Sequence, residues 1–457
     1  MKTALVVVLA AGIALGAFAQ TKTIRIVTYN IETDTGTTTP LPGLIAPSGG
    51  GNVSQGGVLE GIGEEIVAGD PAQPLDILAL QETTSNPTTV APIVSALNTF
   101  YNAPGMYAMS PFQATESGNS PTVGNGPNAL VYNTTTLQLV ASVPVDPVGG
   151  TGKLGSKSGE YREVMRYEFA PAGLIPAPSN EFYIYVSHYK ASTGSTNAFY
   201  RSEEAAIIRT NETSLPTNAR VLYVGDYNVD TSGEAGYQTI LAATSPNGVA
   251  QGQGIDPLNP SASTTIDWSV RTTDKTILPM LSEKSTALDY RDDLQVMTAN
   301  VYNAAPGGLC YVPGSLHSFG NNGTAAYGSA VTAGANTALS TNLGPNPFIT
   351  ASALRQDLTT ASDHLPVVAD YTIPVNLPPL RAGRLTMPAP GVFQFALSNS
   401  DGTSITTAQL PFVQVQSSPD LAHWSAVTNI ALINGALQIA DTNPPASQKF
   451  YRAIEVP

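Results

Sequence analysis

The stretch VLYVGDYNVD, residues 221–230, decides how the chain can be interpreted. Residues 221–224 are apolar, with β-branched and aromatic side chains, which is typical of a buried strand. Gly225 breaks this run, and Asp226 and Asn228 follow two positions apart. In extended backbone such residues point to the same side. We therefore predict that a carboxylate, able to bind a metal or accept a proton, and a carboxamide, able to donate to an oxyanion, project together from the end of a core strand.

An Asp-x-Asn sequence after a strand is also what an ordinary turn cap looks like, so the functional interpretation needs support elsewhere in the chain. Three further predicted strands end in the same way. IRIVTYN ends at Asn30, LDILAL leads to Glu82, and FYIYVS leads to His188. Each has its own structural explanation as a turn former, a solvated strand end or a structural histidine. Their recurrence favours a shared site.

Two later segments add carboxylates and an imidazole. RDDLQVMT, residues 291–298, predicts a strand that begins with two adjacent carboxylates, the second of which is Asp293. Asp363 and His364 lie directly before the predicted strand VVADY. An aspartate beside a histidine at the start of a strand can set the tautomer and charge of the imidazole.

Helices are predicted where apolar residues recur at helical spacing, over residues 59–68, 92–100 and 201–209. Between residue 304 and about residue 347 the chain is rich in Gly, Asn, Ala and Ser, which indicates a long loop insertion. His317 lies in this insertion, away from every strand end described above. We expect it to have no part in a functional site.

Composition narrows the class of protein. The 457 residues leave room for one large domain and a smaller one. Only 12% of residues are charged, and 41 Gly and 36 Pro indicate the loops and strands of a secreted β-rich protein. The net charge of −14 argues against a broad basic surface that binds nucleic acid. If the substrate is a polyanion, cations or a local basic patch must offset the negative electrostatic field of the protein. The sole cysteine, Cys310, excludes an intramolecular disulfide framework.

The N-terminus has the features of a secretory signal peptide. Lys2 precedes an apolar run that closes with Ala17-Phe18-Ala19, a positive start and a small-x-small end. The run is short for a membrane span, although a retained anchor is the alternative. We therefore expect residues 1–19 to be removed and a soluble protein, starting at Gln20, to be exported to the periplasm or the outside of the cell.

The C-terminal part carries no visible catalytic group. We predict a linker over residues 374–381, followed by a small all-β module over residues 382–457. The strict alternation of FVQVQ, residues 412–416, predicts one of its strands. We expect Trp424 to lie in the core of this module.

Five stretches, VTYNIE, ILALQE, VSHYK, VGDYN and SDHLPV, occur in an order that resembles the endonuclease/exonuclease/phosphatase superfamily, the group of deoxyribonuclease I, apurinic endonucleases and sphingomyelinases. The resemblance covers about residues 23–371 and implies a four-layer α/β sandwich, two packed sheets flanked by helices, over residues 23–373. The tail is similar to β-sandwich modules of secreted bacterial proteins, which implies a small all-β sandwich-like domain.

The chain departs from the family pattern at one strand. The family usually has an Arg-Ile-Asp-Tyr strand before its last motif, and RDDLQVMT fits this register best with Asp293 as the functional carboxylate. Asp289 and Asp292 remain alternatives. The insertions after Asn30 and Asp230 and around residue 320 are long and would line the rim of the site.

The resemblance also implies roles for the strand-end residues. Glu82, helped by Asn30, would hold Mg²⁺, Mn²⁺ or Ca²⁺, and Asp363 would complete the metal shell. Asp226 would orient or deprotonate the attacking water, and Asn228 would donate to a non-bridging phosphate oxygen.

Two histidines complete the implied set. His364, oriented by Asp293, would contact the scissile phosphate or act as acid or base. His188 would be a second imidazole on the phosphate side.

Together these features predict a secreted, metal-dependent phosphodiesterase that acts as a monomer on nucleic acid or another phosphodiester, with extracellular nucleic acid as the preferred substrate. A sphingomyelinase-like enzyme or a phosphomonoesterase on the same scaffold is one alternative. A non-catalytic surface-binding protein is another, although the full set of acidic, amide and imidazole residues argues against it.

Overall fold

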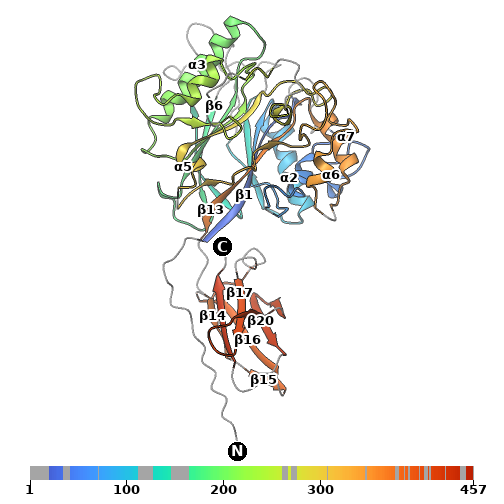
Figure 1. Ribbon diagram of the computed structural model, residues 1–457, viewed down its shortest axis with the longest axis vertical. Coiled ribbons are helices and arrows are strands. Elements are labelled where there is room, and N and C mark those ends of the chain that lie inside the picture. Colours follow the sequence, from blue (N-terminus) through green and yellow to red (C-terminus); the bar gives the residue numbers. More distant parts are fainter. Residues whose placement is uncertain are drawn as a thin grey trace, which may run out of the picture. The chain divides into compact units, whose positions relative to one another are not determined.

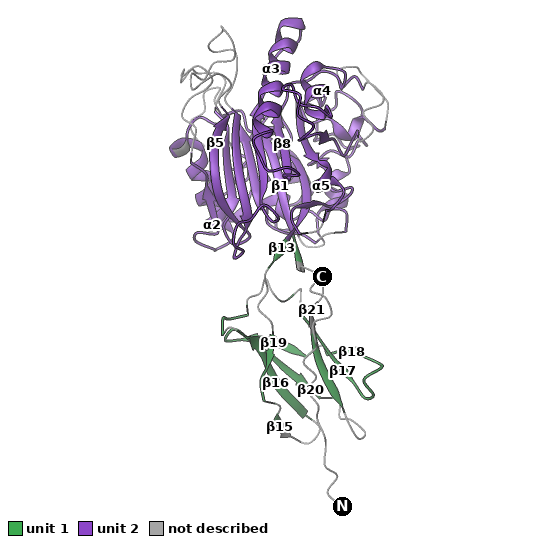
Figure 2. Cartoon of the chain, turned by 90° about the vertical axis from the view of Figure 1, so that its left-hand side faces the viewer, with its two compact units in different colours: residues 1–22, 374–457 green, residues 23–373 purple. Residues whose placement is uncertain are grey.

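The computed structural model divides into two compact units, residues 23–373 and residues 1–22 with 374–457 (Figure 2). The predicted signal peptide, residues 1–19, lies outside the described residues. The structure describes residues 20–33, 42–69, 71–111, 127–145, 164–259, 266–268, 275–305, 307–344, 347–375, 380–384, 386–389, 392–400, 402–405, 410, 413–427, 429–442 and 449–455.

The larger unit contains two sheets. The first has the strand order β11-β13-β1-β2-β4-β3, and β12 pairs with β13 as well. Strands β1 and β2 are parallel, with Asn30 opposite Gln81 at their ends. The strands of this sheet are β1 (Gln20–Asn30), β2 (Ile77–Gln81), β3 (Tyr107–Met109), β4 (Ala129–Asn133), β11 (Cys310–Tyr311), β12 (His317–Ser318) and β13 (Val367–Val375).

The second sheet has the order β5-β6-β7-β8-β10-β9. Strands β7 and β8 are parallel, and β10 runs antiparallel to β8. Its strands are β5 (Leu137–Val145), β6 (Val164–Pro171), β7 (Phe182–His188), β8 (Val221–Asp226), β9 (Gly254–Ile255) and β10 (Asp293–Thr298).

The two sheets pack face to face because their strands alternate between two apolar surfaces. Ile24 and Ile26 of β1 face the other sheet, whereas Val27 and Tyr29 face the helices. In the second sheet, Ile184, Val186, Leu222 and Val224 form part of the core between the sheets, and Tyr183, Tyr185, Val221 and Tyr223 pack beneath helices.

Helices cover both outer faces. The first sheet is covered by α1 (Val58–Gly63), α2 (Ala91–Phe100), α6 (Ala338–Asn342) and α7 (Ala351–Ala361). The second is covered by α3 (Ser195–Glu212) and α4 (Ala235–Leu241), and the short α5 (Ala299–Tyr302) follows β10. Figure 1 shows α3 on one side of the sheets and α2, α6 and α7 on the other. The predicted four-layer α/β sandwich is confirmed. Among the described residues no helix has the length and apolar character that crossing a membrane requires.

Two predicted helices have different bounds in the structure. The helix predicted over 59–68 ends at Gly63, because Glu65 leaves the helical path to form a bridge with Leu343 and an ion pair with His317. By contrast, α3 extends the helix predicted over 201–209 by several residues at each end. Its additional residues lie outside the short apolar run on which the prediction rested.

The smaller unit is all-β, as predicted. One sheet has the order β14-β16-β20-β19 with β15 on β16, and the other has the order β18-β17-β21. The last strand of the larger unit, β13, continues to Val375, and β14 begins at Leu380. The strands are β14 (Leu380–Ala382), β15 (Thr386–Ala389), β16 (Val392–Asn399), β17 (Val413–Ser418), β18 (Ser425–Ala426), β19 (Ile430–Ile433), β20 (Ala436–Asp441) and β21 (Phe450–Glu455).

The prediction that Trp424 lies in the core of this unit is wrong. The core consists of alternating side chains of the strands, such as Phe395 of β16 and Ile439 of β20. Trp424 is half-buried in the segment before β18. Its indole N–H donates to the Leu421 carbonyl, and the guanidinium of Arg452 lies 4.1 Å from the ring centroid. A cation over one ring face and a hydrogen bond at the ring edge hold the indole at the surface.

Candidate active site

Strand alternation brings the predicted site residues to one edge of the sandwich. Residues facing the space between the sheets recur every second position, and the next such position after Val186 is His188 and after Val224 is Asp226. Asn30 has the same parity as Ile26 in β1. His188 lies opposite Asp226 in the ladder between β7 and β8.

Strand β10 reaches the same edge from the opposite direction. Because β10 is antiparallel to β8, its first residue, Asp293, lies opposite Asp226, the last residue of β8. Asp293 has the same parity as Met297, which packs in the core between the sheets. The structure therefore places the carboxylates of two neighbouring strands side by side, one from a strand end and one from a strand start.

Gly225 makes the close contact between β7 and β8 possible. Its φ is 141°, and a Cβ at this position would lie 1.9 Å from the Ser187 carbonyl oxygen. The backbone of β8 can approach β7 this closely only without a side chain. This approach lies one residue before the pair of His188 and Asp226.

Glu82 joins the site through a change of backbone direction. It follows β2 and has a φ of 54°, a left-handed conformation that is uncommon for a residue with a Cβ. The amide of Asn30 then donates from Nδ2 to Glu82 Oε1 and to Asp226 Oδ2, each at 3.0 Å. A carboxamide therefore bridges a carboxylate from each sheet.

Glu82, His188 and Asp226 form a cluster that can hold a metal ion. The Nε2 atom of His188 lies 3.5 Å from Glu82 Oε1 and 3.3 Å from Asp226 Oδ2, and one ligand atom of each residue lies within 4.8 Å of the others. Carboxylate oxygens suit Mg²⁺ and Mn²⁺, and an imidazole is a common ligand of transition-metal ions. The donor set fits a divalent cation, and the ion would offset two carboxylates held close together.

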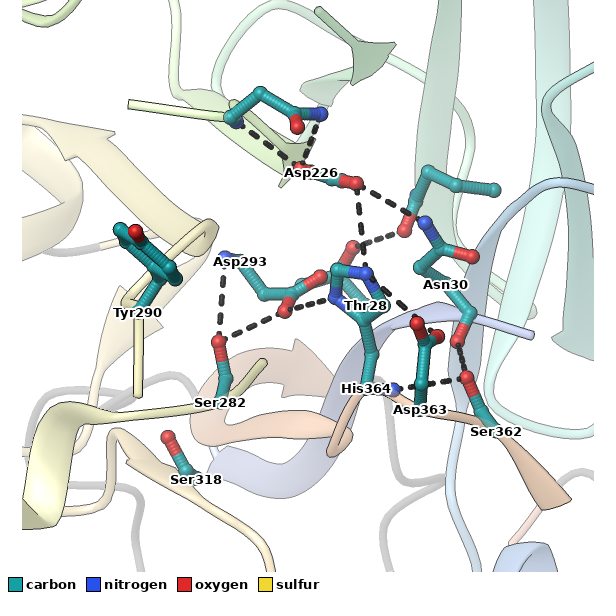
Figure 3. A network of polar contacts seen from close by, with 12 residues as sticks. Thr28, Asn30, Asp226, Ser282, Tyr290, Asp293, Ser318, Ser362, Asp363 and His364 are labelled. Carbon is teal, nitrogen blue, oxygen red and sulfur yellow. Dashed lines mark hydrogen bonds and ion pairs between the residues drawn. The ribbon is translucent and has the colours of Figure 1, made fainter. Parts of the chain in front are cut away.

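His364 forms the second centre of the site. Its Nδ1 lies 2.8 Å from Asp293 Oδ2, and its Nε2 lies 3.9 Å from Asp226 Oδ2 (Figure 3). Burial disfavours the charged imidazole, but the charge of Asp293 and its hydrogen bond outweigh burial and hold the pKa of His364 well above its usual range. The contact with Asp293 therefore favours the protonated form of the His364 imidazole, whose Nε2 faces Asp226.

Of the three carboxylates considered for the partner of His364, Asp293 makes the contact. Asp289 is paired with Lys284 at 2.6 Å. Asp292 points to Glu283 instead, and burial, followed by the charge of Glu283, holds the pKa of Asp292 well above its usual range. This pair of acids, a buried Asp292 and a partly buried Glu283, was not expected from the sequence.

Asn228 and Asp363 lie on the border of the site. Asn228 has a φ of 48° and folds back, donating from its backbone N and its Nδ2 to Asp226 Oδ1 at 3.0 and 2.8 Å. Asp363 is half-exposed, and its Oδ1 lies 3.9 Å from His364 Nε2. In the described residues, the cluster around Glu82 does not include Asp363.

Two serines in the site were missed by sequence reasoning. The Ser282 hydroxyl donates to Asp293 Oδ2 at 2.8 Å. The Ser362 hydroxyl donates to the Asn30 carbonyl at 2.7 Å and accepts a hydrogen bond from the backbone N–H of His364 at 3.0 Å. Ser362 belongs to the quoted SDHLPV stretch and could have been singled out. Ser282 lies in a loop that has no recognisable pattern.

His317 lies in another place, as expected. Its Nε2 contacts Glu65 Oε2 at 2.8 Å and its Nδ1 contacts the Ser315 carbonyl at 2.7 Å. Burial lowers the pKa of His317, but the charge of Glu65 outweighs it and the net shift is upward. The pair joins β12 to the segment after α1.

No protein-family model and no curated protein matches the chain. It is similar to solved structures that include the human Nocturnin catalytic domain with bound sulfate (17% identity, TM-score 0.40, 76% of this chain and 94% of that one). A Bacteroides thetaiotaomicron endonuclease/exonuclease/phosphatase family protein matches at 13% identity and TM-score 0.38, over 78% and 96%. D. rerio TDP2 complexed with single-strand DNA product matches at 11% identity and TM-score 0.39, over 76% and 98%. One of these structures bears the name of the family whose motif order this chain resembles.

Proposed function

We propose that the chain is a divalent-metal-dependent phosphodiesterase of the endonuclease/exonuclease/phosphatase type. The observation that carries this proposal is the convergence of two centres on one edge of the sandwich. Glu82, His188 and Asp226 form a cluster suited to a cation, and the pair of His364 and Asp293 contacts the same Asp226. A phosphodiester carries a negative charge that grows in the transition state, and this site combines a cation position with a charged imidazole.

Each residue has a task that its contacts support. Glu82, His188 and Asp226 would hold Mg²⁺ or Mn²⁺, which supplies charge stabilisation and an acidified water when bound. The raised pKa of His364 keeps its imidazole protonated, so that Nε2–H can donate to a phosphate or leaving-group oxygen. Asp293 orients that ring through Nδ1, and Asn30 holds the two cluster carboxylates in place.

We further propose nucleic acid outside the cell as the substrate, and a monomer as the acting form. With a net charge of −14, the chain would attract a polyanion through bound cations rather than a basic surface. The proposed organisation is a signal peptide over residues 1–19, a catalytic domain over 23–373, a linker over 374–381 and an accessory β module over 382–457.

The test uses the chain from Gln20 to its end, stripped with chelator and assayed with Mg²⁺, Mn²⁺ or Ca²⁺. Plasmid DNA, RNA, sphingomyelin and a nucleotide monoester are the substrates. We expect cleavage of DNA or RNA only after a cation is restored. Cleavage of sphingomyelin alone, or of the monoester alone, would replace nucleic acid by the corresponding alternative. Chelator-resistant hydrolysis, or none with any cation, would contradict the proposal.

A further inference from the structure

The two halves of the candidate site come from different sheets. Asn30, Glu82 and His364 belong to the ends of strands in the first sheet, whereas His188, Asp226 and Asp293 belong to the second. Every contact that joins Asn30 to Asp226, or His364 to Asp293, therefore crosses from one sheet to the other. The geometry of the site depends on how far one sheet is displaced along the other.

Apolar packing alone does not fix that displacement to a fraction of an ångström. The layer between the sheets consists largely of aliphatic and aromatic side chains, and the hydrophobic effect is not directional. Hydrogen bonds are directional, and a bond from one sheet to a backbone carbonyl of the other selects one alignment. A buried amide in this layer would supply that selection, provided that its own groups are satisfied.

Gln295 is such an amide. It is fully buried in β10, two residues after Asp293 and on the same face. Its Nε2 donates to the Ile26 carbonyl at 3.0 Å and to the Val367 carbonyl at 2.8 Å, and its Oε1 accepts from the Tyr371 hydroxyl at 3.0 Å. Both hydrogens of the amide nitrogen are used, and all three partners belong to the other sheet.

The partners of Gln295 lie on the strands that carry site residues. Ile26 is on β1, which ends at Asn30, and Val367 begins β13, three residues after His364. The amide therefore connects the strand of Asp293 to the strand of Asn30 and to the strand that follows His364, in the core layer directly beneath the site. On the other flank, Asn128 Nδ2 donates across the sheets to the Val186 carbonyl at 3.2 Å, two residues before His188.

We propose that Gln295 is a positioning residue, which fixes the alignment of the two sheets and thereby the contact of His364 with Asp293. This role is one of geometry rather than of stability. Its consequence for turnover rests on the proposed function, but its consequence for the contact between His364 and Asp293 does not. A displacement of about 1 Å in a catalytic group can lower a rate by about 10²-fold.

The experiment compares Gln295→Met with Met297→Ala. Gln295→Met keeps a similar volume but removes the amide. Met297 lies on the same strand and face, two residues further from the site, so that Met297→Ala disturbs the same core layer without touching the polar contacts. The readouts are the imidazole N–H resonance of His364 by proton NMR, assigned with His364→Asn, the thermal melt, and kcat and KM with Mn²⁺.

We expect Gln295→Met to fold, to lose or shift the His364 resonance, and to lower kcat roughly 10- to 100-fold with little change in KM. Met297→Ala should melt at a lower temperature than the wild-type chain while it keeps both the resonance and kcat. An unchanged resonance in folded Gln295→Met would overturn the proposal.

Two further outcomes are also decisive. If Gln295→Met does not fold, Gln295→Asn takes its place, because it keeps an amide but shortens its reach by one methylene. If neither variant folds, Gln295 serves stability only and the proposal is wrong. If the wild-type chain hydrolyses no substrate, the proposed function fails, and the resonance still decides the role of Gln295.

Discussion

Asp226 connects the two centres of the site at the scale of single residues. Its Oδ2 contacts Asn30 and His188 and faces His364, and its Oδ1 accepts two bonds from Asn228. The carboxylate is almost fully buried, so that its charge depends on these neighbours and on a bound cation rather than on water.

The first prediction follows from this position. Asp226→Asn should lower kcat by about 10²–10⁴-fold while the protein remains folded, because a proposed cation ligand is lost and a bound cation supplies several kcal/mol of charge stabilisation in the transition state, about 1.4 kcal/mol per tenfold in rate. The measurement is turnover at saturating Mn²⁺ with a thermal melt beside it. Asp230→Asn, four residues further along the chain, is the matched control and should be mild. Near-normal turnover of folded Asp226→Asn would refute the mechanism.

The second prediction concerns pH. The carboxylate of Asp293 stabilises protonated His364, so Asp293→Asn should lower the pKa of that imidazole. In the proposed function the protonated ring acts, so the alkaline limb of the pH–rate profile should move to lower pH, and kcat should fall by roughly 10²-fold. Asp289→Asn removes a carboxylate that pairs with Lys284 and should leave the profile unchanged. A larger effect of Asp289→Asn would assign the functional carboxylate to that position.

The sequence predicts the orientation of a site residue only where the backbone around it is a regular strand. The orientation of Asn30, His188 and Asp226 follows from strand alternation, which a sequence displays. The orientation of Glu82 depends on its own left-handed backbone conformation, and no glycine stands next to it in the sequence to indicate such a conformation. The acid pair of Asp292 and Glu283 depends on the path of a loop, and loops are set by tertiary contacts rather than by periodicity.

At the scale of elements, the close pairing of β7 with β8 depends on Gly225. Gly225→Ala should destabilise the fold by about 3 kcal/mol or more, because strained backbone and an overpacked contact each cost about 1–3 kcal/mol. The new Cβ would meet the Ser187 carbonyl oxygen at 1.9 Å. Gly334→Ala, where a Cβ has no neighbour within 4 Å, is the control. Chemical denaturation measures both, and equal stability of the two variants would contradict this account of the contact.

The contact of β12 with the segment after α1 gives a prediction about pH and stability. Ion pairing raises the pKa of His317 above its unfolded value and lowers that of Glu65. The stabilisation from His317 is therefore complete below about pH 6.5, the ordinary histidine value, and is lost as pH rises through the folded pKa. The contribution of Glu65 is lost as pH falls through its depressed pKa, so the pair is strongest in mildly acidic solution.

His317→Ala should accordingly cost a few kcal/mol near pH 6, since removing one partner of a buried pair typically costs about 3–5 kcal/mol. The loss should be smaller at pH 9, where the wild-type pair is already weakened. Thermal melts of both proteins at the two pH values measure this difference. Turnover should change little, because His317 contacts Glu65 and Ser315 rather than the site. A large loss of turnover in the folded variant would place the insertion in the site.

For the whole molecule, every described residue of the candidate site falls in the unit of residues 23–373. Truncation after Val375, which keeps β13 complete, should leave kcat on a soluble substrate within about twofold of the full chain, since no site contact is removed. The assay compares the two proteins at equal folded concentration. A truncated protein that folds but does not turn over would show that the β module completes the site.

The layered fold of the larger unit could be predicted from the sequence, whereas the positions of some individual side chains in the molecule could not. Apolar runs such as VLYV and FYIYV mark core strands regardless of their partners, so the layered architecture could be inferred. Trp424 was misplaced because an aromatic side chain can be held at the surface by a distant cation, here Arg452, that the local sequence does not reveal.

The position of β13 beside β1 determines when, during synthesis of the chain, the site can form. In the first sheet, β1 comes early in the chain and its neighbour β13 comes at the end of the domain. Ser362 likewise contacts Asn30 across 332 positions of the sequence. A ribosome-bound chain that has not yet emerged as far as His364 lacks half of the centre formed with Asp293. Translation must therefore pass His364 before the pair of His364 and Asp293 can form beside Asp226.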